Sequence, residues 1–163
     1  MNAPDEHDVQ LTVNGVALRA RVESRRTLAD FLREQCGLTG THLACEHGVC
    51  GACTVLLDGA AVRSCLLFAV QAAGCEVTTI EGLSPEDGTL SEIQEALHLC
   101  HGLQCGFCTP GFVVTITAFL GGNPHPSEAE VRQGLSGNLC RCTGYQGIVD
   151  AVLRLAATDT ASA

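Results

Sequence analysis

Hydrophobic and polar residues alternate along much of the first half of the chain. Within residues 9–22 the apolar side chains fall at every second position on both sides of Asn14-Gly15. Such alternation predicts strands buried on one face, and an Asn-Gly pair between two of them is typical of a type I′ hairpin turn. Residues 54–63 repeat the pattern around an Asp-Gly pair, and residues 76–80 predict one more strand.

A short helix is expected between the two hairpins. Thr27 can cap its first turn, and Leu28, Phe31 and Leu32 follow at helical spacing. Two hairpins, a crossing helix and a last strand make a small α+β sheet domain, which we expect over residues 8–83.

Helical spacing replaces alternation after a turn-rich linker at residues 83–90. Ser91 and Ser127 each precede a Gln or Glu by three residues, which is the capping-box pattern that opens a helix. Thr109 is expected to be a further cap, with Pro110 as the first helical residue. Four short helices are therefore predicted near residues 91–101, 112–120, 127–135 and 145–155, with a loop at 121–126. They predict a second domain, a four-helix bundle, over residues 84–160.

The composition argues against binding to nucleic acid or membranes. The 163-residue chain has 18 acidic and nine basic side chains, a formal charge of −9 and no lysine. A surface that neutralises phosphates therefore has little to be built from. Residues 1–10 are acidic and polar where a secretory signal is basic and then apolar, and no apolar run of 18 residues occurs. We expect a cytoplasmic protein without a membrane span.

Eleven cysteines are many for a chain without a secretory signal. A reducing compartment keeps thiols free, and an odd number cannot all pair, so metal ligation explains them better than disulfides. Eight fall into two groups of four, namely Cys45, Cys50, Cys53 and Cys65, and then Cys105, Cys108, Cys140 and Cys142. The other three, Cys36, Cys75 and Cys100, are expected to be small buried hydrophobic residues.

The first group has the spacing C-x4-C-x2-C, and its fourth cysteine follows after 11 further residues. The first three cysteines match the plant-type signature of a loop that wraps around a 2Fe-2S cluster. Gly48 and Gly51 permit positive φ, which lets the backbone curl around the sulfur atoms and direct N–H groups at them. A zinc site is the alternative, although zinc knuckles are usually spaced differently. A Rieske-type site would need a second cysteine-histidine pair, so His47 is expected to be a solvated loop residue.

The second group reads C-x2-C, then 31 residues, then C-x-C. Each of its two cysteine pairs comes shortly before a predicted helix. Helix dipoles and unpaired N–H groups at such positions favour thiolates, which both iron and zinc need as ligands. On these residues alone, iron and zinc both remain open for this group.

The sequence carries no other recognisable catalytic constellation. It has no G-x-S-x-G, no H-E-x-x-H and no phosphate-binding loop. His98 and His101 are expected to be solvated residues at a helix end, because no second group of ligands accompanies them. Two cluster-type sites in one small chain predict an electron conduit that needs a redox partner at each end.

Four motifs support a family resemblance. The sequences CEHGVCGACTV, GLQCGFCTPG and GNLCRCTGY, together with Cys65, resemble the small iron-sulfur subunit of the molybdenum hydroxylases, the superfamily of xanthine oxidase and aerobic carbon monoxide dehydrogenase. The resemblance covers nearly the whole chain and keeps the motifs in order. It implies an N-terminal β-grasp ferredoxin domain with one 2Fe-2S cluster and a C-terminal four-helix domain with another, in agreement with the division made above.

The resemblance also implies roles for single residues. The first group of cysteines would bind the outer cluster, which faces the flavin subunit, and the second group would bind the cluster nearest molybdenum. Gln104 matches a family glutamine that hydrogen-bonds the pterin of the molybdenum cofactor. Cys142 lies where the family brings a cluster ligand and the pterin amino group together.

The implied enzyme is an oxidoreductase whose substrate is converted on another chain. Electrons would pass from a molybdopterin cytosine dinucleotide centre on a large subunit, through the two clusters, to FAD on a medium subunit. In some relatives a haem protein is the acceptor instead. The resemblance implies a dimer of heterotrimers and leaves the substrate open.

Two other functions remain open on the residues alone. A free-standing two-cluster ferredoxin would shuttle electrons between unrelated enzymes and would have no need of Gln104 or of an apolar docking surface. A structural zinc module would lack the brown colour of iron-sulfur clusters. The molybdenum hydroxylase subunit is the leading hypothesis.

Overall fold

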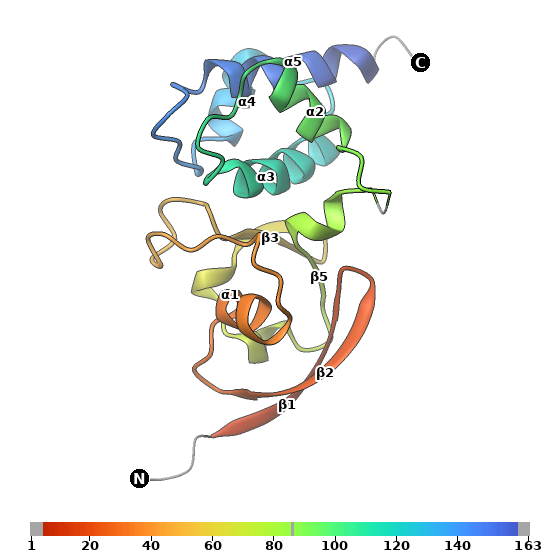
Figure 1. Cartoon of the computed structure of the whole chain (residues 1–163), viewed down its shortest axis with the longest axis vertical. Coiled ribbons are helices and arrows are strands. Elements are labelled where there is room, and N and C mark those ends of the chain that lie inside the picture. Colours follow the sequence, from red (N-terminus) through yellow and green to blue (C-terminus); the bar gives the residue numbers. More distant parts are fainter. Residues whose placement is uncertain (1–4, 86, 160–163) are drawn as a thin grey trace.

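The computed structural model describes residues 5–85 and 87–159, and it has two layers stacked along its long axis (Figure 1). The N-terminal half is a mixed sheet with a short helix on one side, and the C-terminal half is helical. The protein is therefore of the α+β class. The last residue of the predicted helical domain, residue 160, and Glu86 in the predicted linker lie outside the described residues, as do residues 1–4 of the polar opening segment.

The sheet has five strands in the order β2-β1-β5-β3-β4. The strands are β1 (Glu6–Val13), β2 (Val16–Glu23), β3 (Thr54–Leu57), β4 (Ala60–Arg63) and β5 (Glu76–Thr78). Both predicted hairpins are confirmed, because β1 pairs antiparallel with β2 and β3 pairs antiparallel with β4. Asn14 and Gly15 have φ of 49° and 78°, the left-handed values that a type I′ turn requires. The last predicted strand, expected over residues 76–80, ends at Thr78, and a 3-10 turn begins at Ile80.

The helix between the hairpins is more irregular than its pattern predicted. Thr27 caps α1 (Leu28–Asp30) by accepting a hydrogen bond from the Asp30 N–H, as expected. A π-helical turn over Phe31–Gln35 then continues the chain. The wider turn brings Phe31 and Leu32 into the core, where both side chains are almost fully buried against the sheet.

The C-terminal half contains α2 (Glu92–Leu99), α3 (Thr109–Gly122), α4 (Glu128–Gly134) and α5 (Gln146–Asp159). Both capping boxes are confirmed, with Ser91 and Ser127 each accepting a hydrogen bond from the third residue of the helix. The start of α3 corrects the sequence prediction, because Cys108 is the cap and Thr109 is already helical. This helix also runs through Gly121 and Gly122, where a loop was predicted, and Asn123 is its C-cap.

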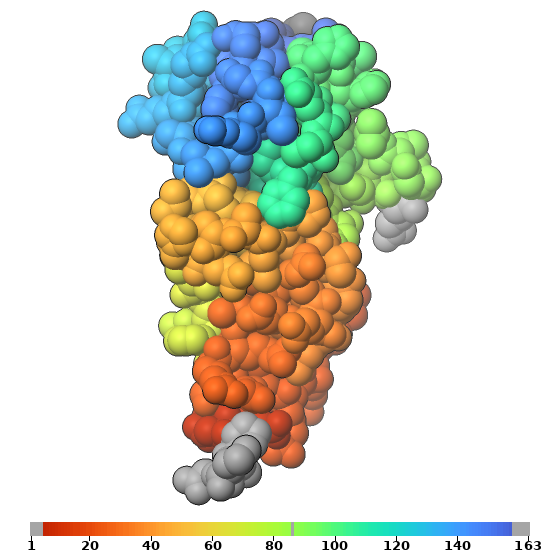
Figure 2. Space-filling view, turned by 60° about the vertical axis from the view of Figure 1, so that its left-hand side comes forward, coloured from red at the N-terminus to blue at the C-terminus, as the bar shows by residue number. Residues whose placement is uncertain are grey.

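The two halves meet where α3 crosses β3 (Figure 1). In the space-filling view, the orange and gold segment of the sheet half lies directly against the teal and blue segments of the helical half (Figure 2). Each half keeps its own buried cluster, one centred on Val9, Leu28 and Phe31 and the other on Phe112, Ile116 and Val152. None of the helices in the described part of the chain has the length and apolar character to cross a membrane.

Candidate metal centres

The first four cysteines, here called the first cysteine site, lie on a loop and the turn beside it. Cys45, Cys50 and Cys53 belong to the loop between α1 and β3, and Cys65 lies in a 3-10 turn directly after β4. The loop curls as predicted, because Gly48 and Gly51 have φ of 86° and 73°. Glu46 also takes a left-handed φ of 53°, a position that the sequence did not reveal.

Main-chain N–H groups point at the sulfur atoms of this site. The N–H groups of His47, Cys50 and Val49 donate to Cys45 Sγ, with Cys50 N at 3.4 Å, and they lower the pKa of Cys45 to about 6. Burial, followed by the contact with Cys53, raises the pKa of Cys65 to about 12, although the Gly48 N–H also donates to its sulfur. The loop therefore favours an anionic sulfur at Cys45, whereas burial disfavours one at Cys65.

The thiols of the first site make contacts in pairs. Cys45 contacts Cys50, and Cys53 contacts Cys65. Cys53 and Cys65 are only 2% and 9% exposed, and they pack with Ala29 and Leu43 beneath the loop. One pair thus lies near the surface and the other pair lies inside the sheet domain.

The other four cysteines form the second cysteine site, which is assembled from two chain segments. Cys105 and Cys108 precede α3, and Cys140 and Cys142 lie in the loop between α4 and α5. The sulfur atoms of Cys142 and Cys105 are 3.5 Å apart, and Cys108 contacts Cys140. The thiols are again paired, each pair joining the two segments.

Side chains join main-chain groups in supporting the second site. Burial and the contact with Cys140 raise the pKa of Cys108 to about 12. Burial opposes ionisation of Cys140, yet hydrogen bonds from the Thr143 hydroxyl, at 3.1 Å, and the Thr143 N–H outweigh it and lower the pKa of Cys140. The Tyr145 hydroxyl accepts a hydrogen bond of 2.9 Å from the Cys140 N–H. Neither Thr143 nor Tyr145 was singled out from the sequence, although both follow the C-x-C pair directly.

The second site opens to the surface. Cys105, Cys142 and the preceding Gln104 are all exposed. Large apolar side chains beside these residues are also exposed, namely Leu103, Phe107 and Leu139. Val49 and Leu66 are exposed beside the first site, and Phe68 is exposed three residues after Cys65.

The paired thiols fit a 2Fe-2S cluster, in which each iron takes two protein ligands. Each site offers two pairs of thiols, and N–H or hydroxyl donors are directed at sulfur in both. Across residues 5–85 and 87–159, no three histidine, cysteine, aspartate or glutamate side chains gather in the arrangement that holds a single metal ion. Clusters bound at these pairs would supply one-electron redox chemistry to the protein.

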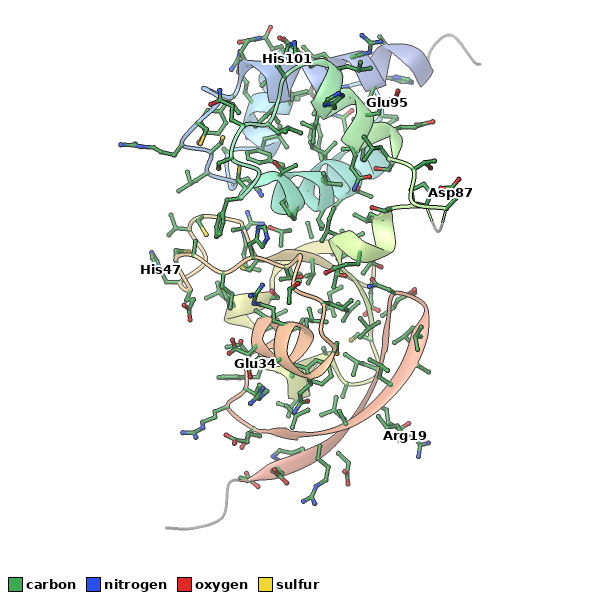
Figure 3. The ribbon with its side chains drawn as sticks, in the orientation of Figure 1. Arg19, Glu34, His47, Asp87, Glu95 and His101 are labelled. Carbon is green, nitrogen blue, oxygen red and sulfur yellow. The ribbon has the colours of Figure 1, made fainter. Side chains whose placement is uncertain are left out.

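The remaining candidates lie outside both sites. Figure 3 shows His47 at the outer edge of the first loop, and its ring nitrogen lies 2.5 Å from the Cys45 carbonyl oxygen. His98 and His101 are exposed at the end of α2, and Figure 3 shows His101 far from His47 of the first loop. Cys36, Cys75 and Cys100 are half-buried rather than fully buried; Cys36 packs on the sheet core and Cys100 on the helical core.

A polar contact between the two sites has no signal in the sequence. The Leu139 N–H donates a hydrogen bond of 2.9 Å to the Cys50 carbonyl oxygen. Asn138, 2% exposed, and Arg63 bind around this contact. Phe107 adds a second contact, stacking on His42 with ring centroids 4.8 Å apart. Residues so distant in sequence could not be paired from local patterns.

Comparison with known families finds iron-sulfur domains in both halves. Residues 11–79 match the family described as 2Fe-2S iron-sulfur cluster binding domain. Residues 79–153 match the family described as 2Fe-2S binding domain.

Whole-chain comparisons extend this result. The chain is 53% identical to caffeine dehydrogenase subunit gamma of Pseudomonas sp. (strain CBB1), covering 93% of this chain and 92% of that protein. It is 56% identical to the nicotine 6-hydroxylase small subunit of Paenarthrobacter nicotinovorans, covering 91% and 89%. The crystal structure of quinoline 2-oxidoreductase from Pseudomonas putida 86 superposes with a TM-score of 0.91 and 50% identity, over 97% of each chain.

Proposed function

Because this chain belongs to the family of small iron-sulfur subunits of molybdenum hydroxylases, we propose that its two cysteine sites hold the two 2Fe-2S clusters of such an enzyme. The protein is an electron-transfer subunit of an oxidoreductase. The proposed ligands of the first cluster are Cys45, Cys50, Cys53 and Cys65, and those of the second are Cys105, Cys108, Cys140 and Cys142. The pairing of the thiols within each site is the observation that carries this assignment.

The proposed domain division follows the two sites. Residues 8–83 would form a β-grasp ferredoxin domain and residues 84–160 a four-helix bundle. The mixed five-stranded sheet supports the first assignment, and the grouping of α2, α3, α4 and α5 around one buried core supports the second.

The exposed second site is the proposed contact with the molybdenum centre. Gln104 would hydrogen-bond the pterin of a molybdopterin cytosine dinucleotide cofactor on a large subunit, and Cys142 would lie beside the pterin amino group. Both side chains are exposed in this chain, and exposed Leu103 and Leu139 next to this site offer apolar surface for a partner. Contiguous exposed apolar surface is typical of sites where another protein binds.

The first site would face the electron acceptor. Exposed Val49, Leu66 and Phe68 support docking of a medium subunit that carries FAD, or of a haem protein in its place. A dimer of heterotrimers in the cytoplasm completes the proposal.

Low-temperature EPR of the protein purified with its partners tests this function. After partial reduction we expect two distinct 2Fe-2S signals, with molybdenum and flavin present by chemical analysis. Two signals from a chain that never co-purifies with molybdenum or flavin would indicate the free-standing ferredoxin instead. Zinc in place of iron would refute both. Nitrogen heterocycles are the first substrates to assay, since caffeine, nicotine and quinoline appear in the names of the relatives.

Gln104→Ala tests the pterin contact. We expect both clusters to remain, because the side chain lies outside the cysteine pairs, while turnover of the assembled enzyme falls by about tenfold, the usual scale for a residue that supports a metal centre. Turnover and molybdenum content are measured against Gln94→Ala, which removes a glutamine from the capping box of α2. Wild-type turnover and molybdenum content would remove Gln104 from the site.

A further inference from the structure

The two cysteine sites are joined by one main-chain hydrogen bond. The Cys50 carbonyl oxygen accepts it from the Leu139 N–H at 2.9 Å, and Leu139 directly precedes Cys140. Cys50, a proposed ligand of the first cluster, is therefore the acceptor of this bond, and Cys140, a proposed ligand of the second cluster, directly follows its donor. The shortest bonded connection between the sites runs through this contact rather than through the intervening chain.

Asn138 is buried at this contact and binds three separate elements. Its Nδ2 donates to the Gly51 carbonyl oxygen in the first loop at 3.2 Å. Its Oδ1 accepts from the Thr115 hydroxyl on α3 at 3.0 Å and from Arg63 Nη2 at the end of β4 at 3.3 Å. Both lone pairs of the amide oxygen are thus used, and only 2% of the residue is exposed.

The backbone around Asn138 is closely packed, with no room for a side chain at Gly51 or Gly111. A Cβ added to Gly51 would lie 2.5 Å from the Gly137 carbonyl oxygen and 2.8 Å from the Asn138 carboxamide. A Cβ added to Gly111 would lie 2.4 Å from the Gly51 carbonyl oxygen. Arg63 Nη2 also donates to the Gly137 carbonyl oxygen at 2.6 Å. Close packing and hydrogen bonds together fix where Leu139 meets Cys50.

We infer that Asn138 is a positioning residue for electron transfer between the two cysteine sites, because its carboxamide holds the Leu139 N–H on the Cys50 carbonyl oxygen. The inference rests on the proposed assignment of clusters to these sites. In the transfer one electron leaves one site, which is oxidised, and enters the other, which is reduced, and no bond or proton is exchanged. Electronic coupling weakens steeply when a hydrogen bond along the route becomes a gap, so the carboxamide controls the rate.

Asn138→Asp breaks one contact selectively. The carboxylate keeps acceptors for Thr115 and Arg63 but replaces the Nδ2 donor with an oxygen that repels the Gly51 carbonyl oxygen. In the full chain with both clusters, we expect transfer between them to slow by about tenfold, as is usual when a supporting contact of a metal site is lost. The magnetic splitting between the two reduced clusters in EPR falls, and hydrogen exchange of the Leu139 peptide speeds up.

The two possible failures are separable. If wild-type protein lacks two 2Fe-2S signals, the cluster assignment itself is wrong. If Asn138→Asp retains both signals with wild-type transfer rate and splitting, the assignment stands and the positioning role is refuted.

If Asn138→Asp loses a cluster, two less disruptive variants on α3 test the positioning role of Asn138 instead. Thr115→Val removes a hydroxyl that donates to Asn138 and lies near the Gly111 carbonyl oxygen at 2.8 Å. Thr117→Val, on the same helix, removes the equivalent contact to the Val113 carbonyl oxygen and none to Asn138. Slower transfer in Thr115→Val alone supports the inference, and equal rates in the two variants overturn it.

Discussion

Each of the two cysteine sites presents four thiols, but the surroundings of the thiols differ. In the first, main-chain N–H groups of a tight loop surround Cys45, and Cys53 and Cys65 are buried in the sheet domain. In the second, the hydroxyl groups of Thr143 and Tyr145 support Cys140, and Cys105 and Cys142 are exposed. Identical ligands therefore do not require identical support. The burial difference leaves the second site accessible to a partner and the first site partly enclosed by its own domain.

Removing one ligand from each site gives the largest contrast. Cys108→Ser is expected to abolish the second 2Fe-2S signal and substrate-driven flavin reduction while the first signal remains, because the sites share no thiol. Cys53→Ser is expected to abolish the first 2Fe-2S signal while the second signal remains. Cys100→Ser, a half-buried cysteine outside both sites, serves as the control in EPR and iron analysis. Retention of both signals in Cys108→Ser would contradict the ligand assignment.

Iron loss is expected to follow burial. In the isolated full chain, the second site should lose iron to a chelator about tenfold faster than the first, which corresponds to a difference of about 1.4 kcal/mol in local opening. The decay of the two EPR signals after chelator addition measures both rates in one sample. Equal rates, or faster loss from the first site, would show that burial of Cys53 and Cys65 does not govern iron retention.

Arg63 connects the sheet half to the helical half, and its loss is expected to lower the free energy of unfolding. Arg63→Leu removes hydrogen bonds to Thr54, Gly137 and Asn138, and we expect the free energy of unfolding to fall by about 2 kcal/mol. Denaturant unfolding provides the measurement. Arg132→Leu removes the exposed ion pair with Glu128 and a hydrogen bond to Gln146, and it should cost less than about 1 kcal/mol. A similar fall in the free energy of unfolding in both variants would mean that the Arg63 contacts between the halves contribute no more than an exposed ion pair.

The smallest effect concerns the hydroxyl group at the second site. The Thr143 hydroxyl donates a hydrogen bond to the Cys140 sulfur, and this bond stabilises the more negative reduced state of the second cluster. Thr143→Val removes that donor. The reduction potential of the second cluster should fall by up to about 40 mV, since a hydrogen bond contributes about 1 kcal/mol. Potentiometric EPR titration resolves this shift. Thr143→Ser keeps the hydroxyl group and should restore the potential, while the first cluster stays unchanged in both variants.

Local features of the fold could be predicted from the sequence because their causes are local. Asn14-Gly15 dictates its turn, Ser91 and Ser127 cap their helices, and the glycines between the first cysteines allow the loop to curl. The π-helical turn at Phe31–Gln35 and the cap at Cys108 were missed, because packing decides them where local patterns favour a regular helix.

The candidate site divides in the same way. Spacing alone selected all eight paired cysteines, since the segments that carry them are short and rich in glycine. Asn138 and Arg63 lacked any such signal, because their contacts join residues from β4, α3 and two loops that meet only in the folded chain. Side chains that set the relation between two sites thus require the three-dimensional structure to be found.

The contact between the halves uses main-chain atoms on both sides, with the Leu139 N–H meeting the Cys50 carbonyl oxygen and glycines at positions 51 and 111. Main-chain atoms are the same whatever residue occupies a position, so this contact does not depend on which side chain position 139 carries. The contact instead constrains the positions that must stay small, and those that carry the Asn138 carboxamide and its partners Arg63 and Thr115. A subunit built in this way can acquire new partner surfaces, and so serve enzymes with different substrates, without altering the hydrogen bond between its two cysteine sites.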